Sequence, residues 1–143
     1  YRGRAGLRTL ANAMDVGDPS NFERLAWFYR NADPRVAGIH AESVDDEAIR
    51  ACIRREHEMH GRIVCPHTAC ALELLARLRA NGHRQPTVVA ATAHPAKFET
   101  VIEPIIGREI PLPPALQELL QRRSHADPLA PVLNALQQTL ISK

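Results

Sequence analysis

Apolar side chains recur every three or four residues along most of the chain, a spacing that gathers them on one face of a helix. The clearest stripe consists of Ile49, Cys52 and Ile53, and it lies between Ser43 and Gly61, a residue suited to end a helix. Acidic residues soon after Ser43 complement the positive end of that helix. The same spacing predicts helices over residues 20–33, 43–61, 66–81, 95–106, 114–122 and 129–141.

Some of these helices carry further signals at or near their ends. Ser20 and Glu23 form a capping-box pattern, in which each side chain satisfies a free backbone N–H at the start of a helix. Pro66 suits a first helical turn, whereas Pro104 is expected to bend or end the helix that begins at Pro95. The apolar face of the helix after Pro66 is expected to consist of Ala71, Leu74, Leu75 and Leu78.

One segment, Thr87-Val-Val-Ala-Ala-Thr92, is apolar on both faces and is bounded by a proline and a turn. Continuous apolarity of this length predicts a strand buried on both sides, as in a parallel sheet. Only residues 36–40 and 62–64 offer further short strands, and a buried strand without neighbours leaves its backbone groups unpaired. The chain, which starts at Tyr1 and not at a methionine, is therefore expected to be part of a larger α/β domain, helix-rich and with few strands of its own.

The composition is that of one ordinary globular domain, with 143 residues of which 45% are hydrophobic and 24% charged. A formal net charge of +2, the absence of a long basic block and only 4% aromatic residues argue against a nucleic-acid partner. No apolar run approaches the ~20 residues that span a bilayer, so no membrane partner is expected. Three cysteines without a CxxC pair, and no signal peptide before them, indicate a reducing compartment and hence a cytoplasmic location.

A polar cluster contains five side chains of the types that bind zinc in proteins: His57, His60, Cys65, His67 and Cys70. Their spacing is unfavourable, because the two leading histidines are three residues apart, where the HExxH motif needs four, and the cysteines form no CxxC knuckle. Buried thiols are more often small core side chains. No metal is therefore expected, and the alternative is a non-catalytic helical module that binds a metal or a partner protein through His57–Cys70.

The most informative segment is Ala91-Thr-Ala-His-Pro-Ala-Lys-Phe98, which joins the predicted strand to a predicted helix. Ligands of open α/β sheets bind at the carboxyl ends of strands, where Thr92 offers a hydroxyl, His94 an imidazole and Lys97 an ammonium group. Ordinary turn chemistry also explains these residues: Thr92 would end the strand, His94 would cap the helix and Lys97 would face solvent. Physical reasoning alone slightly favours this second interpretation.

Residues 91–98 resemble the TAHPAKF signature of the threonine synthase family. Three further segments resemble motifs of that family in the same order: residues 9–16 resemble TLSNAMDV, residues 19–24 resemble PSNFER, and residues 66–69 resemble the PHTA of (D/E)PHTA. The resemblance covers essentially the whole chain and corresponds to the carboxyl-terminal part of the family. Ala11 replaces a serine that is frequent in the family, and Cys65 replaces the acid before PHTA.

The resemblance implies a lyase that uses pyridoxal 5'-phosphate (PLP) to convert O-phosphohomoserine and water into threonine and phosphate. It implies PLP fold type II, the tryptophan-synthase-β-like class, with the cofactor between two α/β domains. The family's cofactor-binding lysine, ring-facing asparagine and glycine-rich phosphate cradle have no counterpart here, and Lys97 belongs to a different motif. Residues 1–143 are therefore expected to be a partial domain that is inactive without a missing amino-terminal portion of the same protein.

By the same resemblance, Thr92 is the residue whose hydroxyl faces the pyridine nitrogen of PLP. His94 and Lys97 are candidates for shaping the site. No residue of the chain is expected to be catalytic or to bind a metal.

Overall fold

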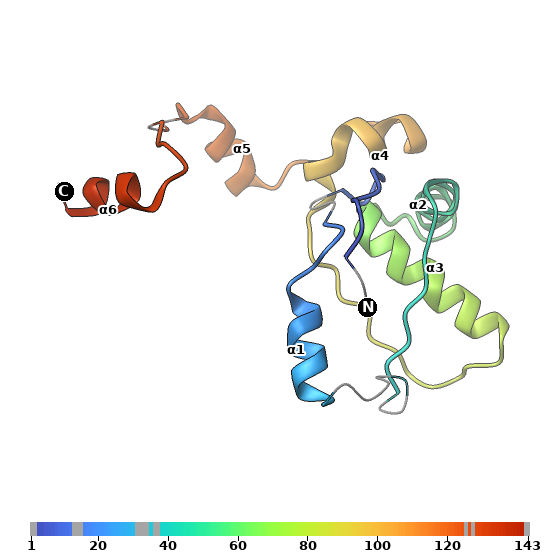
Figure 1. The fold of residues 1–143 in the computed structure, drawn as a ribbon. Coiled ribbons are helices and arrows are strands. Elements are labelled where there is room, and N and C mark those ends of the chain that lie inside the picture. The colour runs from blue at the N-terminus through green and yellow to red at the C-terminus, as the bar shows by residue number, and fades with distance from the viewer. Residues whose placement is uncertain are drawn as a thin grey trace. The chain divides into compact units, whose positions relative to one another are not determined.

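The computed structural model describes residues 3–12, 16–30, 35, 38–124, 126 and 128–141. The chain divides into two compact units, residues 1–111 and residues 112–143, and every regular element in the described ranges is a helix (Figure 1). The first unit contains α1 (Asn21–Phe28), α2 (Asp46–His60), α3 (Pro66–Ala80), the 3-10 helix η2 (Pro95–Phe98) and α4 (Glu99–Ile106). The second unit contains α5 (Pro114–Gln121) and α6 (Leu133–Ile141). None of these helices is long and apolar enough to cross a bilayer.

The two ends of α2 follow from the residues that flank it. Asp45 lies just before the helix in an extended conformation, and its Oδ1 accepts a 2.8 Å hydrogen bond from the Ala48 amide. At the other end, Gly61 has a φ of 64°, a left-handed conformation that glycine adopts without the strain that a Cβ atom brings. The predicted helix is thus confirmed, with its start moved from Ser43 to Asp46.

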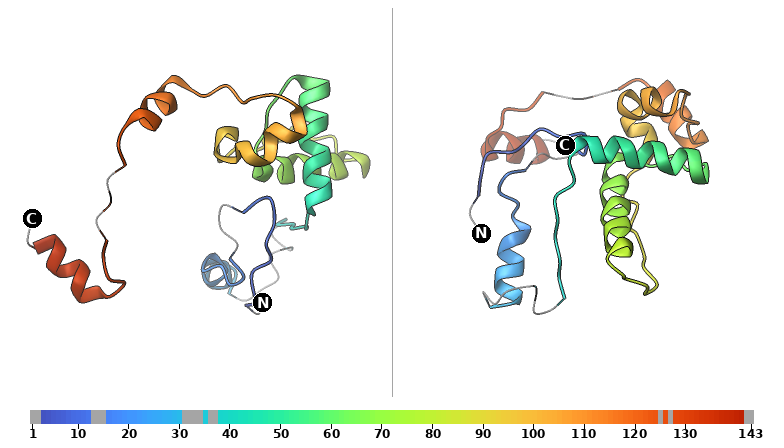
Figure 2. Two further views of the ribbon diagram at one scale, coloured as in Figure 1. Left: turned by 90° about the horizontal axis from the view of Figure 1, so that it is seen from above. Right: turned by 90° about the vertical axis from the view of Figure 1, so that its right-hand side faces the viewer.

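The core of the first unit is centred on α2, which packs against both α3 and α4. In Figure 1, α2 is seen nearly end-on and α3 from the side, and Figure 2 shows the two helices crossing from other directions. The predicted stripe of α2 is confirmed, because Ile49, Cys52 and Ile53 are each 0% exposed. The other core side chains come from the start of α3, from η2, from α4 and from the segment after α4: Cys65, Ala69, Phe98, Ile102 and Ile110.

Residues 87–92 form no strand, so the prediction of a buried strand is wrong for this chain. The segment has no regular secondary structure, and Val88 is 96% exposed. Residues 62–64 and 38–40 contain no strand either, and residues 36 and 37 lie outside the described part of the chain. Because the described residues provide no neighbouring strand, the backbone groups of 87–92 have no ladder to join. The helix-rich character is confirmed, whereas the expected strands are absent from the described residues.

The start of α1 differs from the predicted capping box. Ser20 has helical backbone angles (φ −57°, ψ −20°), and its hydroxyl makes no capping hydrogen bond. A backbone turn takes that role, because the Phe22 amide donates to the Pro19 carbonyl oxygen at 3.0 Å. α1 ends at Phe28 and buries none of its residues, and residues 31–34 lie outside the described ranges.

α3 has the predicted ends but a different buried face. It begins at Pro66 and is followed by Asn81, as expected. The residues it buries are Pro66, Thr68 and Ala69, which lie in its first turn. The predicted inner residues are half-buried or, at Leu78, exposed. The leucine face is therefore only partly covered by the described residues.

The helix predicted from Pro95 is present in two parts. It starts as η2 and continues directly into α4, which ends at Ile106, two residues after Pro104. Gly107 follows with a φ of 70° and closes the helix by a 2.8 Å hydrogen bond from its amide to the Glu103 carbonyl oxygen. The helix therefore continues past Pro104 to the end of the predicted range, and the early end expected from Pro104 is not observed.

The second unit contains the two helices predicted near the end of the sequence. α5 matches the predicted range closely, whereas α6 begins at Leu133, four residues later than expected. Neither helix buries a residue.

Candidate functional site

The segment Ala91–Phe98 changes from irregular chain to helix at His94. Thr92 lies two residues before that point with its side chain exposed. Its hydroxyl makes no hydrogen bond to any described residue. A threonine hydroxyl can donate one hydrogen bond and accept others, so Thr92 is available to a group outside the described chain.

His94 is the capping residue of η2, which confirms the turn interpretation of this side chain. Its Nδ1 accepts a 3.2 Å hydrogen bond from the Ala96 amide, and its carbonyl oxygen accepts one of 3.1 Å from the Lys97 amide. Because Nδ1 is the acceptor, the proton of the neutral ring lies on Nε2. Lys97 is exposed and makes no ion pair with the described residues, as the same interpretation predicts.

The far end of η2 is anchored by Phe98, which is only 8% exposed. Its ring lies 5.1 Å from the imidazole of His67, centroid to centroid, with an angle of 53° between the ring planes. His67 is the second residue of α3 and belongs to the PHTA segment. The structure therefore brings two of the four family-like segments into direct contact, which no spacing in the sequence indicates.

Cys65 caps the start of α3, at the position where the family resemblance leads one to expect an acid. Its Sγ accepts a hydrogen bond from the Thr68 amide at 3.5 Å and lies 3.3 Å from the Thr68 hydroxyl. Both side chains are buried. Aspartate is among the preferred residues at this position because its oxygen accepts the same backbone N–H. Cys65 therefore takes over the capping part of such an acid's role, with a weaker acceptor.

The cluster of possible zinc ligands does not converge in the structure. Residues 57–70 are all described, and no group of three or more His, Cys, Asp or Glu side chains among the described residues is placed to hold a metal ion. Cys65 is instead part of the core, and His67 contacts Phe98. Nothing in this geometry favours the alternative of a metal-binding module.

The thiols of this region are free, and burial governs their chemistry. Burial raises the pKa of Cys52 from 9.0 to about 11, against a smaller lowering effect of the nearby Arg55 guanidinium. Burial also raises the pKa of Cys70. A neutral thiol is a poor nucleophile and a poor metal ligand, so these two side chains act as core residues.

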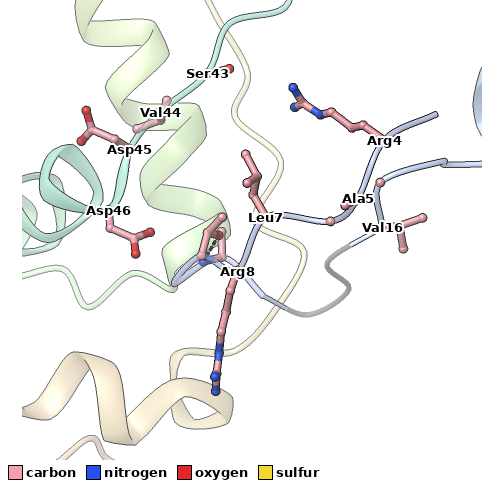
Figure 3. A pocket seen from close by; sticks show the side chains of 13 residues that line it. Arg4, Ala5, Leu7, Arg8, Val16, Ser43, Val44, Asp45 and Asp46 are labelled. Atoms are coloured by element: carbon pink, nitrogen blue, oxygen red, sulfur yellow. Dashed lines mark hydrogen bonds between the residues drawn. The ribbon is translucent and has the colours of Figure 1, made fainter. Parts of the chain in front are cut away.

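A cavity of about 700 Å³ lies between the amino-terminal segment and the residues that precede α2 (Figure 3). Asp46 ties its two sides together, because its Oδ1 accepts a 2.9 Å hydrogen bond from the Leu10 amide. Arg4 and Arg8 contribute to the lining, and in Figure 3 the Arg8 guanidinium points away from Asp45 and Asp46. Sequence reasoning assigned the two aspartates only to the helix end and missed the contact to Leu10, which joins residues 36 positions apart.

An ion-pair network holds α2, α3 and the segment before α2 together. Glu73 accepts hydrogen bonds from Arg55 (3.2 Å) and from Arg77 (3.3 Å). Arg77 also donates to the Ser43 carbonyl oxygen at 3.1 Å and forms an ion pair with Glu42 at 3.6 Å. Because Ser43 also lines the cavity, this network helps to fix one wall of it.

A sequence model described as "Threonine synthase, C-terminal" matches residues 68–140, just over half of the chain. Threonine synthase from Serratia marcescens is 35% identical over 116 residues, which are 81% of this chain and 26% of that protein. Threonine synthase from Escherichia coli (strain K12) is 34% identical over 115 residues, which are 80% of this chain and 26% of that protein.

Two solved structures resemble the chain over almost its whole length. The crystal structure of threonine synthase from Escherichia coli matches 99% of this chain and 32% of that chain, with a TM-score of 0.75 and 29% identity. PLP-bound threonine synthase from Brucella melitensis matches 98% of this chain and 35% of that one, with a TM-score of 0.69 and 26% identity. The chain thus spans about a quarter of the curated relatives and about a third of the solved chains. On the family match and these likenesses together, the chain belongs to the threonine synthase family.

Proposed function

We propose that the chain is the carboxyl-terminal portion of a PLP-dependent threonine synthase. The whole enzyme would convert O-phosphohomoserine and water into threonine and phosphate. The observation that carries the proposal is the fold likeness over 99% of the chain, at a TM-score of 0.75, to about a third of a solved threonine synthase. The PLP bound by the Brucella melitensis relative supports the same cofactor here. The three free thiols are consistent with work in the cytoplasm.

The rest of the enzyme would supply what this chain lacks. The chain has two lysines, Lys97 and Lys143, and neither belongs to a segment that resembles the family's cofactor-binding lysine motif. Segment 87–92 is mostly apolar and mostly exposed, and its backbone has no hydrogen-bond partner among the described residues, so it has the character of a strand that joins a sheet provided by other residues. The missing amino-terminal portion would provide both the lysine and that sheet.

Thr92 is the residue of this chain that we assign to the cofactor. PLP, when bound, would supply an electron-withdrawing aromatic ring that stabilises negative charge on the substrate. The Thr92 hydroxyl fits a ring nitrogen, because it is exposed and makes no hydrogen bond within the described chain. A neutral hydroxyl donates a hydrogen bond to the pyridine nitrogen without transferring its proton, whereas an aspartate at this place would favour a protonated ring. Thr92 would therefore moderate the electron withdrawal and help direct the reaction.

His94 and Lys97 would shape the site from the start of η2. His94 Nδ1 accepts the capping hydrogen bond from the Ala96 amide, which orients the ring. The Nε2–H group remains available as a hydrogen-bond donor. Lys97 keeps an exposed ammonium group near the same turn, and positive charge there favours a phosphate-bearing substrate. Neither residue is assigned a catalytic step.

A hybrid protein tests the proposal. In it, the portion of Escherichia coli threonine synthase that this chain matches is replaced by residues 1–143, and the hybrid is expressed in an E. coli strain that lacks its own threonine synthase. We expect growth without added threonine, at a rate that depends on Thr92. The truncated E. coli enzyme without the inserted chain serves as the control and should not support growth. A soluble, folded hybrid that never supports growth would count against the proposal.

The chain by itself should be inactive. With PLP and O-phosphohomoserine it should form no threonine, and its absorbance should show only free or nonspecifically bound PLP. Stoichiometric binding of PLP to one lysine of the chain, with formation of threonine, would overturn this part of the proposal.

A further inference from the structure

Two family-like segments, PHTA and TAHPAKF, meet through one pair of rings. His67 lies in the first turn of α3 and is half-buried, and Phe98 is the last residue of η2. The centroids of the two rings are 5.1 Å apart and the ring planes are tilted by 53°. Both distance and tilt are within the range of attractive aromatic pairs, in which the edge of one ring approaches the face of the other.

The contact lies at the carboxyl end of η2, and His94 caps the other end. The Lys97 amide donates to the His94 carbonyl oxygen, and the Ala96 amide donates to His94 Nδ1, so the short helix is capped by the residue just before it. Ala93 and Ala96 pack against the core to which Phe98 belongs. A 3-10 helix of four residues has little stability of its own, so it depends on such anchors at its ends.

We infer that His67 is a positioning residue for the turn at Thr92 and His94 and acts through Phe98. The ring of His67 holds Phe98 in one orientation, Phe98 holds η2, and η2 fixes His94 as its cap. Thr92 lies two residues before His94, so its hydroxyl is held with the same turn. The functional meaning of this coupling rests on the proposed role of Thr92, whereas the coupling of His67 to η2 does not.

The lysine content of the chain provides a selective probe of η2. Lys97 and Lys143 are the only lysines, so a lysine-specific endoproteinase makes one internal cut, after Lys97. Cleavage of a folded segment requires local opening, and its rate follows the population of the open form when closing is fast. Changing His67 to alanine (His67→Ala) should speed this cleavage about 2- to 12-fold, the range that the loss of one aromatic pair produces. His67→Phe keeps a ring at this place and should restore a rate within about twofold of the parent.

A matched control separates this local effect from general destabilisation. Ile53→Val removes one methyl group from the core of α2, at a residue that does not belong to η2 or to the ring pair. The variants are compared at urea concentrations that give them equal global free energies of unfolding. The inference predicts faster cleavage after Lys97 in His67→Ala than in Ile53→Val under these conditions. Equal rates in these two variants, or equally fast cleavage in His67→Phe and His67→Ala, would overturn it.

The hybrid enzyme connects the same variants to the reaction. His67→Ala should lower kcat with a smaller change in KM for O-phosphohomoserine, because the turn at Thr92 is held less firmly, and His67→Phe should recover most of the loss. Unchanged kinetics in His67→Ala would contradict the functional half of the inference. If the hybrid itself is inactive, the proposed function fails, while the proteolysis result still decides whether His67 holds η2.

Discussion

Replacing Cys65 with alanine removes the side chain that caps the start of α3, and the expected loss in the free energy of unfolding follows from the contacts of that side chain. The Thr68 amide loses its acceptor, the Cys65 sulfur at 3.5 Å. Loss of a helix cap costs about 0.5–2 kcal/mol, and the lower half of that range applies because sulfur is a weak acceptor. Cys65 is 1% exposed, so its sulfur also leaves a cavity of roughly 20 Å³, which costs about 0.5 kcal/mol. We therefore expect Cys65→Ala to lower the free energy of unfolding by about 1–1.75 kcal/mol.

Cys65→Ser is the matched control for this prediction. It keeps an acceptor of nearly the same size at the same place, and a hydroxyl oxygen accepts more strongly than sulfur. The stronger cap offsets the lost burial of sulfur, so we expect a change within about 0.5 kcal/mol of the parent chain. Urea unfolding followed by far-ultraviolet circular dichroism measures all three proteins. If serine costs as much stability as alanine, the sulfur contributes by packing alone and the capping argument is wrong.

Three further predictions concern single residues of the chain. In the hybrid enzyme, Thr92→Val should weaken PLP binding or slow turnover by about 1–3 kcal/mol, roughly 5- to 150-fold, and Thr92→Ser should have a much milder effect. A Thr92→Val enzyme that binds PLP and turns over like the parent would contradict the assignment of Thr92 to the cofactor. Burial raises the pKa of Cys52 from 9.0 to about 11, so the folded state holds the thiol proton more tightly than the unfolded state does. The contribution of this proton to the free energy of unfolding is therefore complete below pH 9 and is lost as the pH rises toward 11. Urea unfolding across that range should show a steeper decline for the parent than for Cys52→Ala, and parallel declines would contradict the argument. Gly61→Ala should lower the free energy of unfolding by about 1–2 kcal/mol in the same assay, since the added methyl group meets open space and only the left-handed backbone conformation disfavours it. An unchanged free energy of unfolding would show that this backbone conformation is not required.

Local signals in the sequence were sufficient for most of the helices. Gly61 and Pro66 mark ends that depend on the conformation of one residue, and the structure has both. The stripe of Ile49, Cys52 and Ile53 needed only helical periodicity to be recognised. Ser20 shows the limit of such signals, because a capping pattern also requires an extended backbone at the first residue, which Ser20 does not have.

Features that depend on distant residues could not be predicted in the same way. The apolar run at 87–92 indicates a buried strand only if a sheet is present, and the described residues provide none. The contact between His67 and Phe98 joins residues 31 positions apart, and the hydrogen bond from Leu10 to Asp46 joins residues 36 positions apart, so helical periodicity indicates neither. The family resemblance supplied the role expected of Thr92, which composition and spacing left open between a ligand contact and a turn.

The most direct test of the central claim is the product assay of the purified hybrid enzyme. With PLP and O-phosphohomoserine, the hybrid that contains residues 1–143 should release threonine and phosphate in equal amounts, while the chain alone releases neither. Phosphate release without threonine, or no reaction from a folded hybrid that binds PLP, would contradict the claim that this chain is the carboxyl-terminal portion of a threonine synthase.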